Sequence, residues 1–142
     1  NIDVNASQIP WQLDDDNDTM LPVMQTDIML SKNRSILIID AKYYSQTTQV
    51  LYNTHTLHSA NLYQIFTYVK NKAAECKEYS CEVSGMLLYA KTDETVLPNQ
   101  SYSMSGNEIS VCTLDLDCDF NHIARQLNEI VIEHFDLPKE TS

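Results

Sequence analysis

Residues 24–30 (MQTDIML) and residues 35–44 (SILIIDAKYY) are two largely apolar stretches that flank a short polar turn. Their length and their aliphatic and β-branched composition predict a pair of adjacent β-strands. Charge interrupts both strands, because Asp27 lies in the first and Asp40 and Lys42 lie in the second. An ionised group on a buried strand is strongly destabilising unless it is paired or bound to a metal. These three side chains therefore indicate a functional site.

Strand geometry directs the charged groups toward one point. Side chains alternate along a strand, so Asp40 and Lys42 project from one face and Ala41 from the other. If the two strands pair as a hairpin, Asp27 reaches the same end of the sheet. Two converging carboxylates favour a hard divalent cation such as Mg²⁺, which completes its shell with water and phosphate oxygens. A lysine beside a metal-bound water orients it or assists its deprotonation, so the set predicts phosphodiester hydrolysis.

A helix is predicted to begin at Ser59, a good N-cap residue, and to end near Lys72. Apolar residues at helical spacing predict its core face: Leu62, Ile65, Phe66 and Val69. Asn61, Gln64 and Tyr68 cluster roughly 120° around the helix from that face. Gln64 and Tyr68 are neighbours at i and i+4, so they either flank the site together or form an ordinary boundary stripe.

The other segments predict three further strands and a second helix. The strands are expected at residues 6–13, 83–90 and 108–114, with loops at 14–18, 45–58 and 91–106. Asp117 or Asp119 caps the second helix, whose apolar stripe is Phe120, Ile123, Leu127, Ile130 and Val131. The histidines of the first long loop, His55 and His58, are either surface residues or groups near a bound phosphate. The fold class is α/β, with a mixed sheet of about five strands and helices packed on it.

Composition limits the classes of protein to which the chain can belong. Its 142 residues and 43% hydrophobic content predict a single domain, residues 1–142, with its own core. Only 2 glycines and no Gly-rich phosphate loop mean that a partner must bind any nucleotide. The net charge of −11, with 9 Lys and Arg residues, argues against tight DNA binding by this chain alone. Either the domain does not contact nucleic acid, or other domains deliver it to DNA.

The cysteine pattern and the apolar runs concern the compartment. The 4 cysteines include no C-x-x-C pair and are expected to be reduced thiols of a cytoplasmic protein. No apolar run approaches the roughly 20 residues that span a bilayer, so no membrane partner is expected. The chain begins at Asn1, which suggests an internal start within a longer protein.

The charged residues of the two strands resemble a known nuclease motif. Asp27, followed by 12 residues and then Asp40-Ala41-Lys42, resembles the PD-(D/E)xK signature, with Thr26 where the motif name has proline. The pair Gln64-x-x-x-Tyr68 resembles the additional motif of the RecB-like branch. Residues 21–44, 59–68 and 85–90 together resemble the McrC family, the nuclease subunits of McrBC 5-methylcytosine restriction systems. This resemblance covers roughly residues 8–135.

The resemblance implies a restriction-endonuclease-like fold whose first core helix would lie upstream of Asn1. It implies that Asp27, Asp40 and the Ala41 carbonyl hold Mg²⁺, with Mn²⁺ able to substitute, and that Lys42 orients the attacking water. Gln64 and Tyr68 would position Lys42 or a phosphate. DNA methylation would be read by other domains or subunits, and GTP would enter only through a McrB-like motor subunit.

Two other interpretations remain open. A non-catalytic scaffold or binding module with a nuclease fold is favoured by the charge of −11 and opposed by the intact Asp27, Asp40 and Lys42. The second is a RecB-like exonuclease unrelated to modified-base restriction. Residues 59–68 favour the McrC family over that exonuclease.

Overall fold

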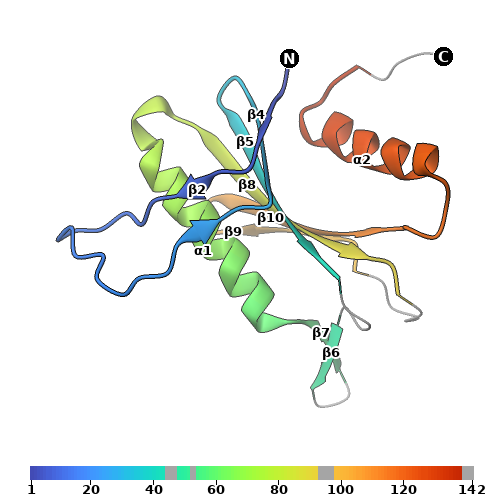
Figure 1. Ribbon diagram of the computed structural model, residues 1–142, viewed down its shortest axis with the longest axis horizontal. Helices are drawn as coiled ribbons and strands as arrows, with labels where there is room; N and C mark the ends of the chain where they lie inside the picture. The colour runs from blue at the N-terminus through green and yellow to red at the C-terminus, as the bar shows by residue number, and fades with distance from the viewer. Residues whose placement is uncertain (44–47, 52–53, 93–97, 139–142) are drawn as a thin grey trace.

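A six-stranded mixed sheet forms the centre of the computed structural model, which describes residues 1–43, 48–51, 54–92 and 98–138 (Figure 1). The strands lie in the order β1 (Asp3–Asn5), β4 (Ile28–Lys32), β5 (Ser35–Lys42), β8 (Glu82–Ala90), β10 (Asn107–Leu114) and β9 (Gln100–Met104). The three central strands β5, β8 and β10 are parallel, and the other neighbours are antiparallel. The predicted α/β class is confirmed, with six strands in place of about five.

Helix α1 (Ser59–Glu75) connects the parallel strands β5 and β8 and packs on the sheet. The approach to β8 is close at Gly85, where an added Cβ would lie 2.7 Å from side-chain atoms of both Ile65 and Val69. Real Cβ atoms do not approach that closely, so the absence of a side chain at Gly85 sets how deeply α1 sits on β8. A short 3₁₀ turn, η1 (Lys77–Tyr79), then leads into β8.

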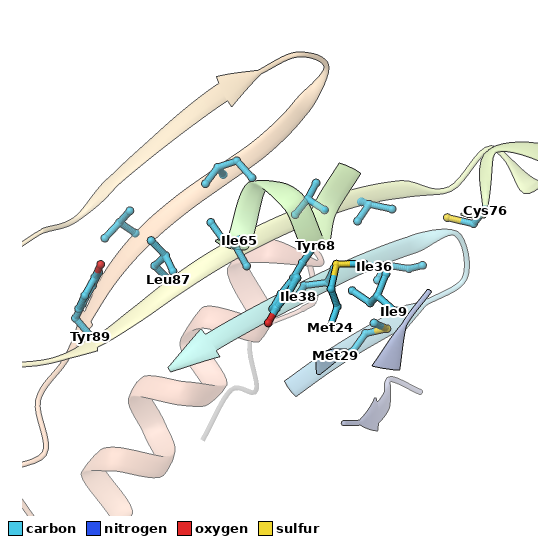
Figure 2. Close-up of a cluster of buried hydrophobic side chains, with 14 residues drawn as sticks. Ile9, Met24, Met29, Ile36, Ile38, Ile65, Tyr68, Cys76, Leu87 and Tyr89 are labelled. Atoms are coloured by element: carbon cyan, nitrogen blue, oxygen red, sulfur yellow. The ribbon is translucent and has the colours of Figure 1, made fainter. Parts of the chain in front are cut away.

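The two faces of the sheet carry separate apolar clusters. The face toward α1 holds the larger cluster, which Figure 2 shows with Ile38, Ile65, Tyr68, Leu87 and Tyr89 among its members. The opposite face holds Leu30, Leu37, Ile39, Met86 and Leu88. Helix α2 (Phe120–His134) lies on that second side (Figure 1), and its Ile130 and Val131 pack against this cluster.

The second helix is capped as the sequence predicts, but its apolar stripe is only partly covered. Asp119 is the N-cap, and its carboxylate accepts a hydrogen bond from His122 N at 2.8 Å. Phe120 and Leu127 remain exposed, at 79% and 38% of their surface. The apolar periodicity predicted the helix correctly. It shows which residues share a face of the helix, but it does not show how much of that face is buried.

The strand predicted over residues 24–30 is not continuous, since the chain leaves the strand at Thr26 and bends at Asp27. On one side of the bend, β3 (Met24–Gln25) pairs with β2 (Gln8–Ile9) in a separate two-stranded ribbon, and on the other side β4 begins. Thr26 is buried, and its hydroxyl donates to Ser7 O at 2.8 Å and accepts from Ser7 N at 3.1 Å. Thr26 N also donates to Ser7 O at 3.0 Å, so three hydrogen bonds hold Thr26 against Ser7 at the bend. The predicted strand 6–13 is also wrong, because within it only Gln8–Ile9 form a strand, β2, while β1 precedes it.

One predicted helix and two predicted loops are corrected. Helix α1 has His58 rather than Ser59 as its N-cap, and it extends beyond Lys72 to Glu75. The predicted loop 45–58 contains a hairpin of β6 (Thr48–Leu51) and β7 (Thr54–Leu57). The predicted loop 91–106 contains β9, which pairs with β10. These short strands are largely polar, so they lack the alternating pattern that marks a strand in sequence.

The four cysteines are free thiols. Burial, followed by the neighbouring Cys81, raises the pKa of Cys76 to about 11. Across the described ranges, none of the helices has the length and apolar content needed to cross a membrane.

Candidate active site

The carboxyl end of β5 places Asp40 and Lys42 on the face of the sheet that α1 covers. Strand alternation puts them in line with Ile38, a member of the apolar cluster under α1. β5 lies between β4 and β8, but its pairing with β4 stops at Ile39, so Asp40 and Lys42 pair with β8 alone. Asp40 is only 5% exposed. Lys42 Nζ lies 2.9 Å from Asp40 Oδ2.

Asp27 reaches the same point from the bend before β4. The register pairs Ile28 with Ile39, so Ala41 lies beyond the first residue of β4. Asp27 Oδ2 accepts the hydrogen bond from Ala41 N at 3.0 Å, in the place where a continued β4 would run. The bend therefore brings the Asp27 carboxylate to the end of β5 while leaving that side chain exposed. The expected convergence of Asp27 with Asp40 is present in the structure.

The ionisation of Asp40 is opposed by its surroundings. Burial is the largest cause and raises the pKa of this carboxyl; Lys42 lowers it, and the neighbouring Asp27 raises it. The buried Oδ2 atom makes no directed hydrogen bond within the described residues, although Lys42 Nζ is 2.9 Å away. Lys42 and Asp40 therefore form a close ion pair, and it only partly offsets the effect of burial on this carboxyl. A buried, incompletely satisfied carboxylate oxygen is a costly group that a bound cation would stabilise.

Gln64 and Tyr68 extend the site into α1. Gln64 Oε1 accepts a hydrogen bond from Lys42 Nζ at 2.7 Å, and Gln64 Nε2 donates to the Tyr68 hydroxyl oxygen at 2.9 Å. Tyr68 is 7% exposed and lies among the apolar residues beneath the helix (Figure 2). The i, i+4 spacing thus brings both side chains to Lys42. The structure connects Asp40, Lys42, Gln64 and Tyr68 in one continuous series of polar contacts.

The buried face of α1 differs from the predicted one. Its buried residues are Asn61, Ile65, Tyr68 and Val69. Ile65 and Val69 are thus buried as predicted, whereas Leu62 and Phe66 of the same predicted face are only half-buried. The helix is rotated so that its polar stripe faces the strand ends. The cause is the position of α1 over β8, where Ile65 and Val69 straddle Gly85.

One buried polar pair was not predicted. Asn61 Nδ2 donates to the Tyr89 hydroxyl at 2.9 Å, and these residues are 5% and 0% exposed. The sequence placed Asn61 in the same stripe as Gln64 and Tyr68 but gave it no role, and Tyr89 was part of an apolar run. The signal that could have found the pair is a polar residue of the helix stripe opposite a tyrosine near the end of the next strand.

The donor set at this point fits a magnesium ion. Mg²⁺ binds through one or two carboxylates and keeps several waters, which matches Asp27 and Asp40. No group of three or more His, Cys, Asp or Glu side chains converges anywhere in the described part of the chain, so a ligand-rich zinc-type site is not built here. Ala41 contributes its N–H to Asp27, and the metal-binding role of its carbonyl stays a prediction. The side chain of His55 lies outside the described residues, and His58 is half-buried before α1.

A mixed sheet flanked by helices, with two acids and a lysine at the end of a central strand, defines a restriction-endonuclease-like fold. The family model of the McrBC 5-methylcytosine restriction system component matches residues 4–90. The chain is also 32% identical over 131 residues to the type IV methyl-directed restriction enzyme EcoKMcrBC of Escherichia coli strain K12. That match covers 90% of the chain and 36% of the relative, so the chain spans about a third of the relative's length. The chain belongs to the McrBC restriction system family, which confirms the resemblance inferred from its sequence.

Proposed function

We propose that this chain is the metal-dependent nuclease domain of a modified-cytosine restriction system and that it hydrolyses DNA phosphodiesters. The observation that carries the proposal is the convergence of Asp27, Asp40 and Lys42 at one end of β5. The buried Asp40 carboxylate has an incompletely satisfied oxygen and lies next to a second acid and an amine, and such a group destabilises the folded state. A buried carboxylate with a raised pKa beside a second acid is typical of a functional site, here one that a bound cation would stabilise.

Each side chain has a separate part in the proposed chemistry. Asp27 and Asp40 would hold Mg²⁺, with Mn²⁺ able to substitute. The ion would act as a Lewis acid on the phosphate and as an activator of bound water. Lys42 is held from two sides, by Asp40 and by Gln64, so its ammonium group is fixed where it can orient the attacking water. The same positive charge would offset the negative charge that develops on the phosphate.

Gln64 and Tyr68 would act on Lys42 rather than on the phosphate. The Gln64 amide is oriented by its bond to the Tyr68 hydroxyl, which leaves its carbonyl oxygen directed at Lys42. An amide held in this way limits the positions that the lysine ammonium group can take. The proposed role of this pair is therefore to keep the amine in place between Asp40 and the water.

The acidity of the chain supports the proposal that other parts of the assembly bind the DNA. A net charge of −11 gives little attraction for phosphates. The relative is described as methyl-directed, and the family as part of a 5-methylcytosine system. We therefore propose that other domains or subunits recognise methylated DNA and that a McrB-like motor subunit supplies GTP hydrolysis. In this proposal the complex acts in the cytoplasm, and this domain cuts the DNA presented to it.

The experiment is a cleavage assay with the full-length protein, its motor subunit, GTP, Mg²⁺ and methylated DNA. Asp40→Ala and Lys42→Ala are each expected to abolish cutting. Lys77→Ala is the matched control, because Lys77 is exposed in η1 and follows the opposite end of α1 from Gln64. Cutting that survives Asp40→Ala or Lys42→Ala would overturn the assignment. Cutting of unmethylated DNA ends without GTP would instead indicate a RecB-like exonuclease.

A further inference from the structure

The buried bond between Asn61 and Tyr89 joins α1 to β8 directly beside the proposed catalytic lysine. We propose that Asn61 and Tyr89 are positioning residues, which fix the beginning of α1 on the end of β8 so that Gln64 meets Lys42. This inference rests on the proposed nuclease function and adds two residues to the machinery of that site. Neither residue is placed in contact with DNA or metal.

The register of the sheet puts this bond next to the lysine. Lys42 of β5 is the parallel partner of Tyr89 of β8. Asn61 precedes Gln64 by three residues, which is about one helical turn. The bond from Asn61 to Tyr89 and the bond from Gln64 to Lys42 are therefore consecutive polar links between α1 and two neighbouring strands. Figure 2 shows Tyr89 near the end of β8, in the same buried cluster as Tyr68 of α1.

The position of α1 on β8 explains why the hydrogen bond between Asn61 and Tyr89 is needed. The helix packs on β8 through the contacts of Ile65 and Val69 around Gly85, whereas Lys42 is on β5. Gln64 reaches across to the adjacent strand, so its distance to Lys42 depends on where the helix lies along β8. Apolar contacts resist separation but allow small shifts, because the hydrophobic effect has no direction. A hydrogen bond loses strength steeply outside a narrow range of distance and angle, so it fixes the position.

The beginning of α1 lacks two features that commonly stabilise the N-terminus of a helix. Within the described residues, the N-cap His58 makes no side-chain capping bond, and the first turn contains no acidic side chain. Asn61 is nonetheless buried, although asparagine is a poor choice for a buried helical position unless it is hydrogen-bonded. The bond to Tyr89 satisfies the amide at a place where an apolar residue would otherwise be favoured. An asparagine at position 61 is explained if its bond to Tyr89 keeps Gln64 in position to contact Lys42.

Tyr89→Phe tests the proposal by removing one hydroxyl in the full-length protein assayed with its motor subunit, GTP, Mg²⁺ and methylated DNA. The expected result is a roughly ten- to hundredfold lower kcat with an unchanged KM for DNA. In the proposed function other domains or subunits bind the DNA, so the substitution would misplace only Lys42. Tyr63→Phe is the matched control, since Tyr63 is 71% exposed on the same helix. It is expected to leave kcat unchanged. Wild-type kcat in Tyr89→Phe would overturn the proposal.

Two double variants separate positioning from simple stabilisation. Asn61→Leu combined with Tyr89→Phe replaces both polar partners by apolar groups, so stability should return toward wild type while kcat stays low. In a Gln64→Ala background, Tyr89→Phe should lower kcat no further, because the lysine has already lost the contact that Asn61 and Tyr89 position. An equal loss in both backgrounds, or recovery of kcat with stability, would show a structural role only.

The activity of Asp40→Ala separates a failure of the proposed nuclease function from a failure of the proposed positioning role. If Asp40→Ala still cuts DNA, the proposed function fails, whatever Tyr89→Phe does. If Asp40→Ala is inactive and Tyr89→Phe is fully active, only the positioning role fails.

Discussion

Gly85→Ala should weaken both the fold and the proposed active site, although it adds a single methyl group. The new Cβ would lie 2.7 Å from Ile65 Cγ1 and from Val69 Cγ2, and 3.3 Å from Ile109 Cδ1. Carbon atoms pack at about 3.5–4.0 Å, so α1 must move outward by about 1 Å. Ile65 and Val69 cannot rotate away easily, because β-branched side chains are restricted at χ1.

The expected cost follows from two opposing effects. Overpacking a core costs about 1–3 kcal/mol, while replacing glycine in a strand returns about 0.5–1 kcal/mol of backbone entropy. The free energy of unfolding should therefore fall by about 1–2 kcal/mol, seen as a lower midpoint in urea with an unchanged slope. The same outward movement would lengthen the 2.7 Å bond between Lys42 and Gln64 beyond the roughly 3.2 Å limit of a good hydrogen bond. DNA cleavage should fall with it.

Gly106→Ala is the control for this prediction. Gly106 has a φ of +85° in the turn between β9 and β10, and nothing lies within 4 Å of an added Cβ. Alanine there should cost about 1 kcal/mol through backbone strain alone and leave cleavage unchanged. A Gly85→Ala protein as stable and as active as wild type would refute the reasoning about the seat of α1.

Three further outcomes are expected. Asp40→Asn should raise the free energy of unfolding in urea at pH 7 while abolishing cleavage. Burial raises the pKa of Asp40 in the folded state above its ordinary value of 3.8. The free energy of unfolding therefore falls as the pH rises from 3.8 through the folded pKa, and asparagine, which does not ionise, avoids this loss. A variant that is less stable than wild type at pH 7 would contradict this. Gln64→Ala should lower kcat for DNA cleavage more than it lowers the urea midpoint, because the amide is only partly buried; an unchanged kcat would remove it from the site. Cys76 should resist alkylation at pH 8 until urea unfolds the chain, because burial raises its pKa to about 11; rapid labelling of native protein, read by mass spectrometry, would disagree.

The parts of the site that the sequence predicted depend on local periodicity. The two-residue period of a strand places Asp40 and Lys42 on one face, and the i, i+4 spacing of a helix places Gln64 beside Tyr68. The turn after residue 32 makes the antiparallel pairing of β4 with β5, and that pairing brings Asp27 near. None of these relations needs knowledge of distant contacts.

The features that sequence reasoning missed depend on partners far along the chain. The bend at Asp27 exists because Thr26 bonds to Ser7, 19 residues earlier. The bond between Asn61 and Tyr89 spans 28 residues. The rotation of α1 follows from how the helix sits over Gly85, which no pattern within the helix records. The short strands β6, β7 and β9 have largely polar sequences, so periodicity does not reveal them, although each pairs with a neighbouring strand.

The most direct test of the central claim is a calorimetric titration of Mn²⁺ into the protein, because a shared ion between Asp27 and Asp40 underlies every proposed step. Wild-type protein should bind Mn²⁺, and Asp27→Asn and Asp40→Asn should each lose that binding. Asp16→Asn, in the exposed acidic segment 14–18, is the control and should bind as wild type does. Equal affinity in wild type, Asp27→Asn and Asp40→Asn would contradict the account.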